Sequence, residues 1–94
     1  MNLKFDGKIW HWRGPAPYYF VTVPAEESSD LKAISGAVTY GWGVIPVRAR
    51  IGQTEFQTSL FPKAGAYLVP LKDRVRQAEN LREGDTVTIQ LEVG

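Results

Sequence analysis

The chain has 94 residues, of which 44% are hydrophobic and 22% are charged. This is the size of one ordinary domain, and the composition is far from that of chains that stay disordered, so we expect a single domain over residues 1–94. Eleven Lys and Arg against ten Asp and Glu leave a formal net charge of +1, which excludes strong attraction of the whole molecule to nucleic acid or to an acidic membrane.

The sequence contains no cysteine, which excludes disulfides, thiolate nucleophiles and Cys-type metal sites. The first residues carry Lys4 and Asp6 where a signal peptide needs an apolar stretch. A run of about eighteen apolar residues, as a membrane-spanning helix requires, occurs nowhere in the sequence. We therefore expect a cytoplasmic monomer that uses no cofactor and does not bind a membrane.

Two strands are predicted at the start of the chain. Apolar and polar side chains alternate over residues 3–9 of a predicted strand that continues to Trp12. Trp10 and Trp12 then fall on the opposite parity, as in a strand that twists or carries a bulge. Residues 18–23 are rich in aromatic and β-branched side chains, which favour strands, and Pro24 stops them.

A short helix is predicted over residues 24–34. Its proline suits a first helical turn, its early acidic residues face the positive end of the helix, and its apolar residues are three positions apart. We expect Ser35 and Gly36 to end it. The glycine-containing stretch 36–43 is the expected flexible loop.

Three segments then predict three strands: residues 45–51 and 54–61, which flank a two-residue turn, and residues 66–71. Gly52 followed by Gln53 is the pattern of a type II′ hairpin between the first two. Residues after the second strand, from Pro62 to Gly65, are expected to form the next turn. The proline at position 70 suggests that the third strand lies at a sheet edge or carries a bulge.

A second helix and a last strand complete the prediction. Asp73 can cap a helix that runs through Leu81. Residues 86–93 alternate apolar and polar side chains more regularly than any other segment. The predicted order therefore gives a mainly β fold, in which six strands curl into a small closed or split barrel with two short helices.

Several short segments, taken in their order and spacing, carry a resemblance to a known family. They are residues 19–24, 42–47, 51–52, 58–63, 71–72, 75–76 and 84–85. Over nearly the whole chain the sequence resembles the small β-barrel family DUF1905. The resemblance implies a double-split β-barrel, related in architecture to swapped-hairpin DNA-binding regulators, and it implies no established activity.

Catalytic and metal-binding patterns are weak. His11 is the only histidine, and its place between two tryptophans favours a strand side chain at the rim of the barrel over a catalytic base. No serine lies in a Gly-x-Ser-x-Gly setting. The acidic residues Glu26, Glu27 and Asp30 fit a solvated helix start better than a metal site. We predict no catalytic residue and no bound metal.

Basic and aromatic side chains form the candidate site. The candidate ligand-binding residues are Trp42, Arg48, Arg50, Lys63, Lys72 and Arg76. Cations near the start of a helix are unfavourable unless a carboxylate or a bound anion lies nearby. Because Glu55, Asp73 and Glu79 can supply that carboxylate, a solvated charged face is the alternative interpretation.

Three functions of different classes are open at this point. The leading hypothesis is a non-enzymatic binding module that holds a partner protein or a small anionic ligand. The second is sequence-tolerant nucleic-acid binding, which aromatic side chains beside arginines favour and the near-zero net charge disfavours. The third and least favoured is a small hydrolase that acts through His11 and a carboxylate.

Overall fold

The computed structural model describes residues 1–38 and 43–94. Within these residues the chain forms six strands and two helices, which confirms the predicted order of elements. The elements are β1 (Asn2–Trp12), β2 (Tyr18–Thr22), α1 (Ala25–Val38), β3 (Ile45–Ile51), β4 (Thr54–Lys63), β5 (Ala66–Leu71), α2 (Asp73–Ala78) and β6 (Thr86–Val93). Neither helix in the described ranges has the length and the apolar content that crossing a bilayer requires.

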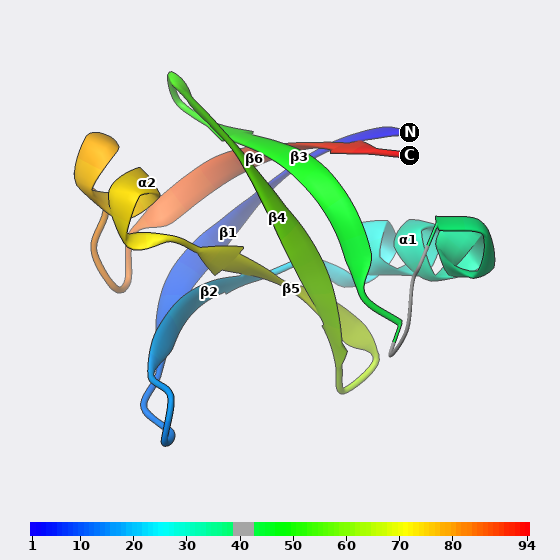
Figure 1. Cartoon of the computed structure of the whole chain (residues 1–94), viewed down its shortest axis with the longest axis horizontal. Helices are drawn as coiled ribbons and strands as arrows, with labels where there is room; N and C mark the ends of the chain where they lie inside the picture. The colour runs from blue at the N-terminus through cyan, green and yellow to red at the C-terminus, as the bar shows by residue number, and fades with distance from the viewer. Residues whose placement is uncertain (39–42) are drawn as a thin grey trace.

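The strands close into an antiparallel barrel in the order β1-β2-β5-β4-β3-β6 (Figure 1), which confirms the predicted mainly β barrel. Two strands change partners along their length. β1 pairs with β6 as far as Lys8 and with β2 from Ile9 on. β4 pairs with β3 as far as Leu60 and with β5 from Phe61 on. These two strands therefore join a first sheet (β1-β6-β3-β4) to a second sheet (β1-β2-β5-β4). The finer double-split assignment stays a prediction of the resemblance.

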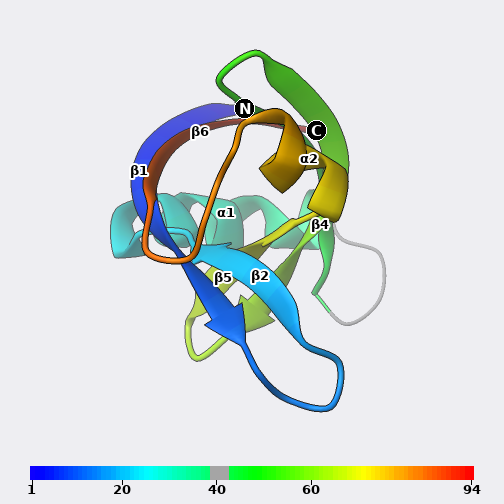
Figure 2. The same cartoon turned by 90° about the vertical axis from the view of Figure 1, so that its left-hand side faces the viewer.

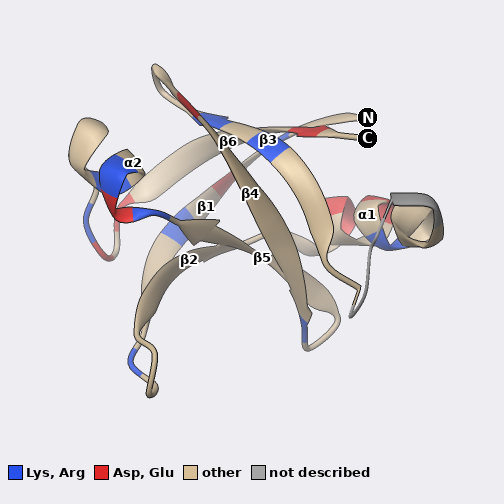
Figure 3. Ribbon diagram, viewed as in Figure 1, with Lys and Arg blue, Asp and Glu red and all other residues tan. Residues whose placement is uncertain are grey.

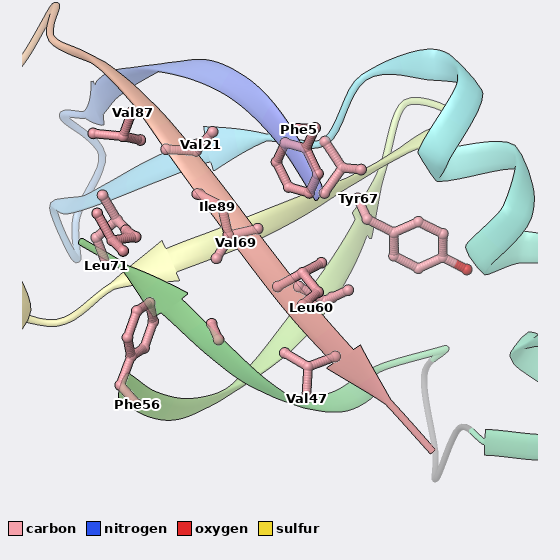
Figure 4. Close-up of a cluster of buried hydrophobic side chains, with 14 of the residues drawn as sticks. Phe5, Val21, Val47, Phe56, Leu60, Tyr67, Val69, Leu71, Val87 and Ile89 are labelled. Carbon is pink, nitrogen blue, oxygen red and sulfur yellow. The ribbon is translucent and has the colours of Figure 1, made fainter. Parts of the chain in front are cut away.

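The barrel interior is filled by alternate residues of the strands. In β3 and in β6 every second residue is buried without a break, as period-two patterning predicts. Figure 4 shows the resulting cluster, with Phe5 and Ile89 pointing among side chains from the other strands. Leu31 of α1 and Val75 of α2 belong to the same core, so each helix is attached to the barrel through a fully buried side chain.

Gly7 lies where β1 passes closest to β2, just before it changes partners. A Cβ atom built on Gly7 would lie 2.5 Å from Cγ1 of Val21, which is itself completely buried. Since real Cβ atoms do not approach so closely, one of the two residues would have to shift. Glycine at this position therefore permits the close passage of the two strands.

α1 extends away from the barrel and is tied to it near its start (Figure 1). The Ser28 hydroxyl donates to the carbonyl oxygen of Val23 at 3.0 Å and accepts the N–H of Tyr67 at 3.2 Å. The predicted end of this helix at Ser35 and Gly36 was wrong. The Ser35 hydroxyl donates a hydrogen bond to the Lys32 carbonyl oxygen inside the helix, and a Cβ atom on Gly36 would meet nothing within 4 Å. Neither residue ends the helix, which continues to position 38. The rest of the predicted loop, residues 39–42, lies outside the described residues.

α2 is shorter than predicted, because Asn80 ends it. The N–H of Leu81 bonds to the carbonyl of Arg76 at 2.8 Å, and Asn80 adopts a left-handed φ of 55°. This is the Schellman arrangement that closes a helix. The predicted cap at Asp73 was also wrong: the N-cap is Lys72 and forms no side-chain cap bond, while the Asp73 carboxylate accepts a hydrogen bond from Arg76 at 2.5 Å.

The hairpin turns were predicted in part. Gly52 has a φ of 59° and Gln53 does not share the positive value, as a type II′ turn requires. The next turn is not the predicted four residues from Pro62, because β4 continues through Lys63. The turn itself is Ala64 and Gly65, whose φ values of 51° and 83° are typical of a two-residue type I′ hairpin.

Two further expectations about strands offered alternatives: the sheet edge at Pro70 and the bulge in β1 were wrong, and the twist of β1 stays a prediction. β5 lies between β2 and β4, so Pro70 does not mark an edge strand. Pro70 lies opposite Phe20 of β2. The pairing of β5 with β4 ends at Leu68, so at Pro70 no strand is hydrogen-bonded to the other side of β5. β1 needs no bulge at Trp10 and Trp12, because the register runs on regularly and both rings lie on the outer face.

We expect Ile89→Ala to lower the free energy of unfolding by about 2–5 kcal/mol, because it removes methyl groups from a completely buried position. Arg48→Ala should change it by less than about 1 kcal/mol, because that side chain is 58% exposed and its ion pair is weak. Urea denaturation of both variants measures the difference. Equal losses would contradict the assignment of inner and outer faces.

We expect Gly7→Ala to destabilise the protein by about 1–3 kcal/mol, because the added methyl group overpacks against Val21. Gly36→Ala is the matched control. Its Cβ would meet nothing within 4 Å, and alanine in a helix is favoured over glycine by about 0.5–1 kcal/mol. Thermal unfolding of both variants tests the pair, and a Gly7→Ala protein as stable as the parent would show that the strands are not in close contact there.

Candidate functional site

Arg48 and Arg50 lie on the outer face of the first sheet, each opposite a carboxylate. Arg48 faces Glu92 of β6 with an N–O distance of 3.6 Å, and Arg50 faces Glu55 of β4 at 2.5 Å. Both arginines line one shallow groove of about 350 Å³, together with Lys4. Because all these side chains are substantially exposed, the pairs add little stability and leave the groove nearly balanced in charge.

A second hollow, which we call the basic depression, has a surplus of positive charge. It has a volume of about 400 Å³ and is lined by Arg48, Glu55, Phe56, Gln57, Lys72 and Arg74. Its cations come from β3, from the junction of β5 with α2, and from α2 itself, and Figure 3 shows basic segments on β3 and at that junction. The fold thus brings two of the candidate residues, Arg48 and Lys72, to the same hollow. It also places there Arg74, which was not among the candidate residues.

The carboxylates near the basic depression are already engaged. Glu55 pairs with Arg50, which does not line the depression. Asp73 pairs with Arg76. Within the described ranges no carboxylate oxygen lies within 4.0 Å of the charged atoms of Lys72 or Arg74. The neighbouring acids therefore do not neutralise these two cations directly, and the depression keeps a surplus of positive charge.

The other candidate residues lie elsewhere. The Lys63 ammonium lies over the ring of Trp12, 5.2 Å from its centroid. The Arg76 guanidinium lies over the ring of Tyr19, with its Cζ atom 3.9 Å from the ring centroid. Neither side chain lines the basic depression. Trp42 falls outside the described residues.

His11 is part of the stack on Tyr19. The two rings are nearly parallel, with centroids 4.3 Å apart. The Nδ1 atom of His11 and the Nε atom of Arg76 are buried without a hydrogen-bond partner in the described structure. A general base needs a partner that orients its ring, and here the orientation comes from stacking. The proposed absence of catalysis stays a prediction.

The hydroxyl of Tyr18 lies near the same stack. Burial raises its pKa above the ordinary value of 10, the Asp73 carboxylate raises the pKa further, and the Arg76 guanidinium partly offsets both effects. Among the described residues, no group of three or more His, Cys, Asp and Glu side chains is arranged to hold a metal ion.

The candidate set did not include a cluster on the outer face of the second sheet, which we call the aromatic face. Its members are Trp10, Trp12, Tyr18, Phe20, Phe61, Leu68 and Pro70, which share the outward parity of their strands. The Phe20 ring lies 5.3 Å from that of Trp10, 6.4 Å from that of Trp12 and 5.6 Å from that of Tyr18. Phe20 is consequently only 8% exposed on the outside of a barrel.

Two rings of the aromatic face remain open to solvent, because Trp12 is 44% exposed and Phe61 is 45% exposed. Other members are held in place: the Trp10 indole donates to the Thr22 hydroxyl at 3.0 Å. The signal in the sequence was the common parity of aromatic residues on both strands of the first hairpin, opposite to the core parity. Recognising this signal as a cluster required the strand register, which pairs Trp10 with Phe20.

The comparisons with known proteins give a family and assign no activity. No curated protein matches the chain. A family model described as "Domain of unknown function (DUF1905)" matches residues 5–91, which is nearly the whole chain and confirms the resemblance seen in the sequence. The chain therefore belongs to the DUF1905 family.

Proposed function

We propose that this protein is a non-enzymatic binding module that holds a small anionic ligand in the basic depression. The observation that carries the proposal is the convergence of Arg48, Lys72 and Arg74 on one hollow, where Glu55, the one carboxylate among the described lining residues, already pairs with another arginine. Arg48 also pairs with Glu92, but in the described ranges Lys72 and Arg74 have no carboxylate within ion-pair distance, and a bound anion offsets the surplus of positive charge that remains. The cytoplasm stays the proposed location.

The lining favours phosphate or carboxylate groups as the part of the ligand that is recognised. Arg48 and Arg74 present planar sets of donors that suit such oxygens, Lys72 adds a compact charge, and the Gln57 amide adds a neutral donor. The volume of about 400 Å³ lies in the range of small-molecule sites. A protein partner, the other half of the hypothesis, finds little apolar surface here, because Phe56 is almost fully buried.

We expect moderate affinity. At about 4 Å, an ion pair near a protein surface is worth roughly 1–4 kcal/mol before desolvation is subtracted. The depression is open and its side chains are mostly exposed, so water weakens each ion pair with a bound anion. Three such pairs predict a dissociation constant in roughly the micromolar to millimolar range. Binding should also weaken as salt is added, since the charges are not shielded by burial.

The test is isothermal titration calorimetry with inorganic phosphate, pyrophosphate, a sugar phosphate and adenosine monophosphate. We expect at least one of them to bind, and Lys72→Ala and Arg74→Ala each to weaken that binding about five- to tenfold through loss of one cation. Arg82→Ala is the matched control, because Arg82 is an exposed cation that does not line the depression.

The parent protein showing no heat of binding with the whole panel at low salt would sink the proposal. So would a loss of affinity in the Arg82→Ala control that equals the loss in Arg74→Ala, because the attraction would then come from the general charge of the molecule.

A further inference from the structure

We propose that the aromatic face is a second binding site, separate from the basic depression, and that it binds single-stranded nucleic acid. Base rings stack on exposed aromatic side chains, and this contact tolerates any base sequence. The aromatic face offers two such rings, Trp12 and Phe61, each nearly half exposed. The site lies on the second sheet, whereas the basic depression is built around β3, β4 and the start of α2.

The spacing of residues on β4 suits a nucleotide. Phe61 and Lys63 are two positions apart on one strand, so both side chains emerge on the same face, about 7 Å apart. This is close to the separation between a base and the next phosphate along a single strand. A base stacked on Phe61 therefore places a phosphate near the point where the Lys63 side chain leaves the strand.

Lys63 also links the two exposed rings. Its ammonium lies 5.2 Å from the centroid of the Trp12 ring, although β4 and β1 lie at opposite ends of the second sheet. The lysine thus reaches over the face of the sheet, and its cation lies over the Trp12 ring and in contact with solvent. A cation held beside a stacking ring is the combination that single-strand binders use.

One cation, Lys63, lies at the aromatic face and can meet a phosphate. None of the seven residues that define the face is acidic, although the Asp73 carboxylate lies near enough to Tyr18 to act on its pKa. Lys63 also lines a hollow of about 260 Å³ at the β4–β5 turn, together with Lys32 and Tyr67, and none of the described residues that line it is acidic. An apolar protein surface or a neutral sugar would use the rings but not the cation. A nucleic-acid strand uses both, which is why we choose it as the occupant.

The face is also rigid before binding. Phe20 and Leu68 are buried beneath the exposed rings, and Trp10 is fixed by its hydrogen bond to Thr22. The stacking surface is therefore formed in the free protein, and a strand that binds it loses little affinity to ordering of the protein side chains.

The experiment measures fluorescence anisotropy of a labelled oligothymidylate titrated with the protein, at several salt concentrations between about 50 and 200 mM. Phe61→Leu removes the aromatic ring and keeps an apolar side chain, and Phe61→Tyr keeps a ring. Lys63→Ala removes the cation. Lys4→Ala is its matched control, because Lys4 is an exposed lysine on the outer face of the first sheet.

We expect saturable binding that weakens with salt. Phe61→Leu should weaken it about five- to a hundredfold, and Phe61→Tyr should bind like the parent. Lys63→Ala should reduce the slope of log affinity against log salt by about 1, and Lys4→Ala should leave it unchanged. Phe61 and Lys63 are both exposed, so we expect their variants to fold, and circular dichroism of each variant checks this.

A variant with Arg48, Lys72 and Arg74 all replaced by alanine separates this site from the proposed anion site, and it should keep the oligonucleotide affinity within about threefold. The inference is overturned if the parent shows no saturable binding at low salt. It is equally overturned if Phe61→Leu and Lys63→Ala bind as the parent does, or if the triple variant alone abolishes binding.

Discussion

The barrel closes because β1 and β4 each belong to both sheets. β1 leaves β6 after Lys8 and pairs with β2 from the next residue on, and β4 leaves β3 and pairs with β5 in the same way. Only glycine at position 7 allows β1 to pass Val21 so closely. With both sheets sharing these strands, every inward side chain has to fit one closely packed interior.

The outward-facing residues give the two outer faces their different characters. Aromatic residues with outward parity cover the outside of the second sheet, where Phe20 is nearly buried although it lies outside the barrel. The first sheet carries charged residues in cross-strand pairs such as Arg48 with Glu92. Because α2 follows directly after β5, Lys72 at their junction and Arg74 in α2 lie near Arg48. These three side chains give the basic depression its surplus of positive charge.

Local patterns predicted the fold better than the site. The alternation through Ile89 depends only on neighbours in sequence, and it identified the last strand and its buried face. The early end of α2 at Asn80 was missed because a left-handed residue other than glycine has a weak local signal. The proximity of Arg48 to Lys72 and the burial of Phe20 under Trp10 depend on strand register and closure, which bring together residues far apart in sequence.

The central claim, that two shared strands close the barrel, is tested most directly by cross-strand nuclear Overhauser effects in solution. The account predicts backbone contacts from β1 to both neighbours, joining Leu3 to Leu91 and Trp10 to Phe20. It predicts the same for β4, with Phe61 in contact with Leu68 of β5 and the earlier residues of β4 in contact with β3. Contacts from either strand to one neighbour alone would contradict the account, because the sheet would then be open.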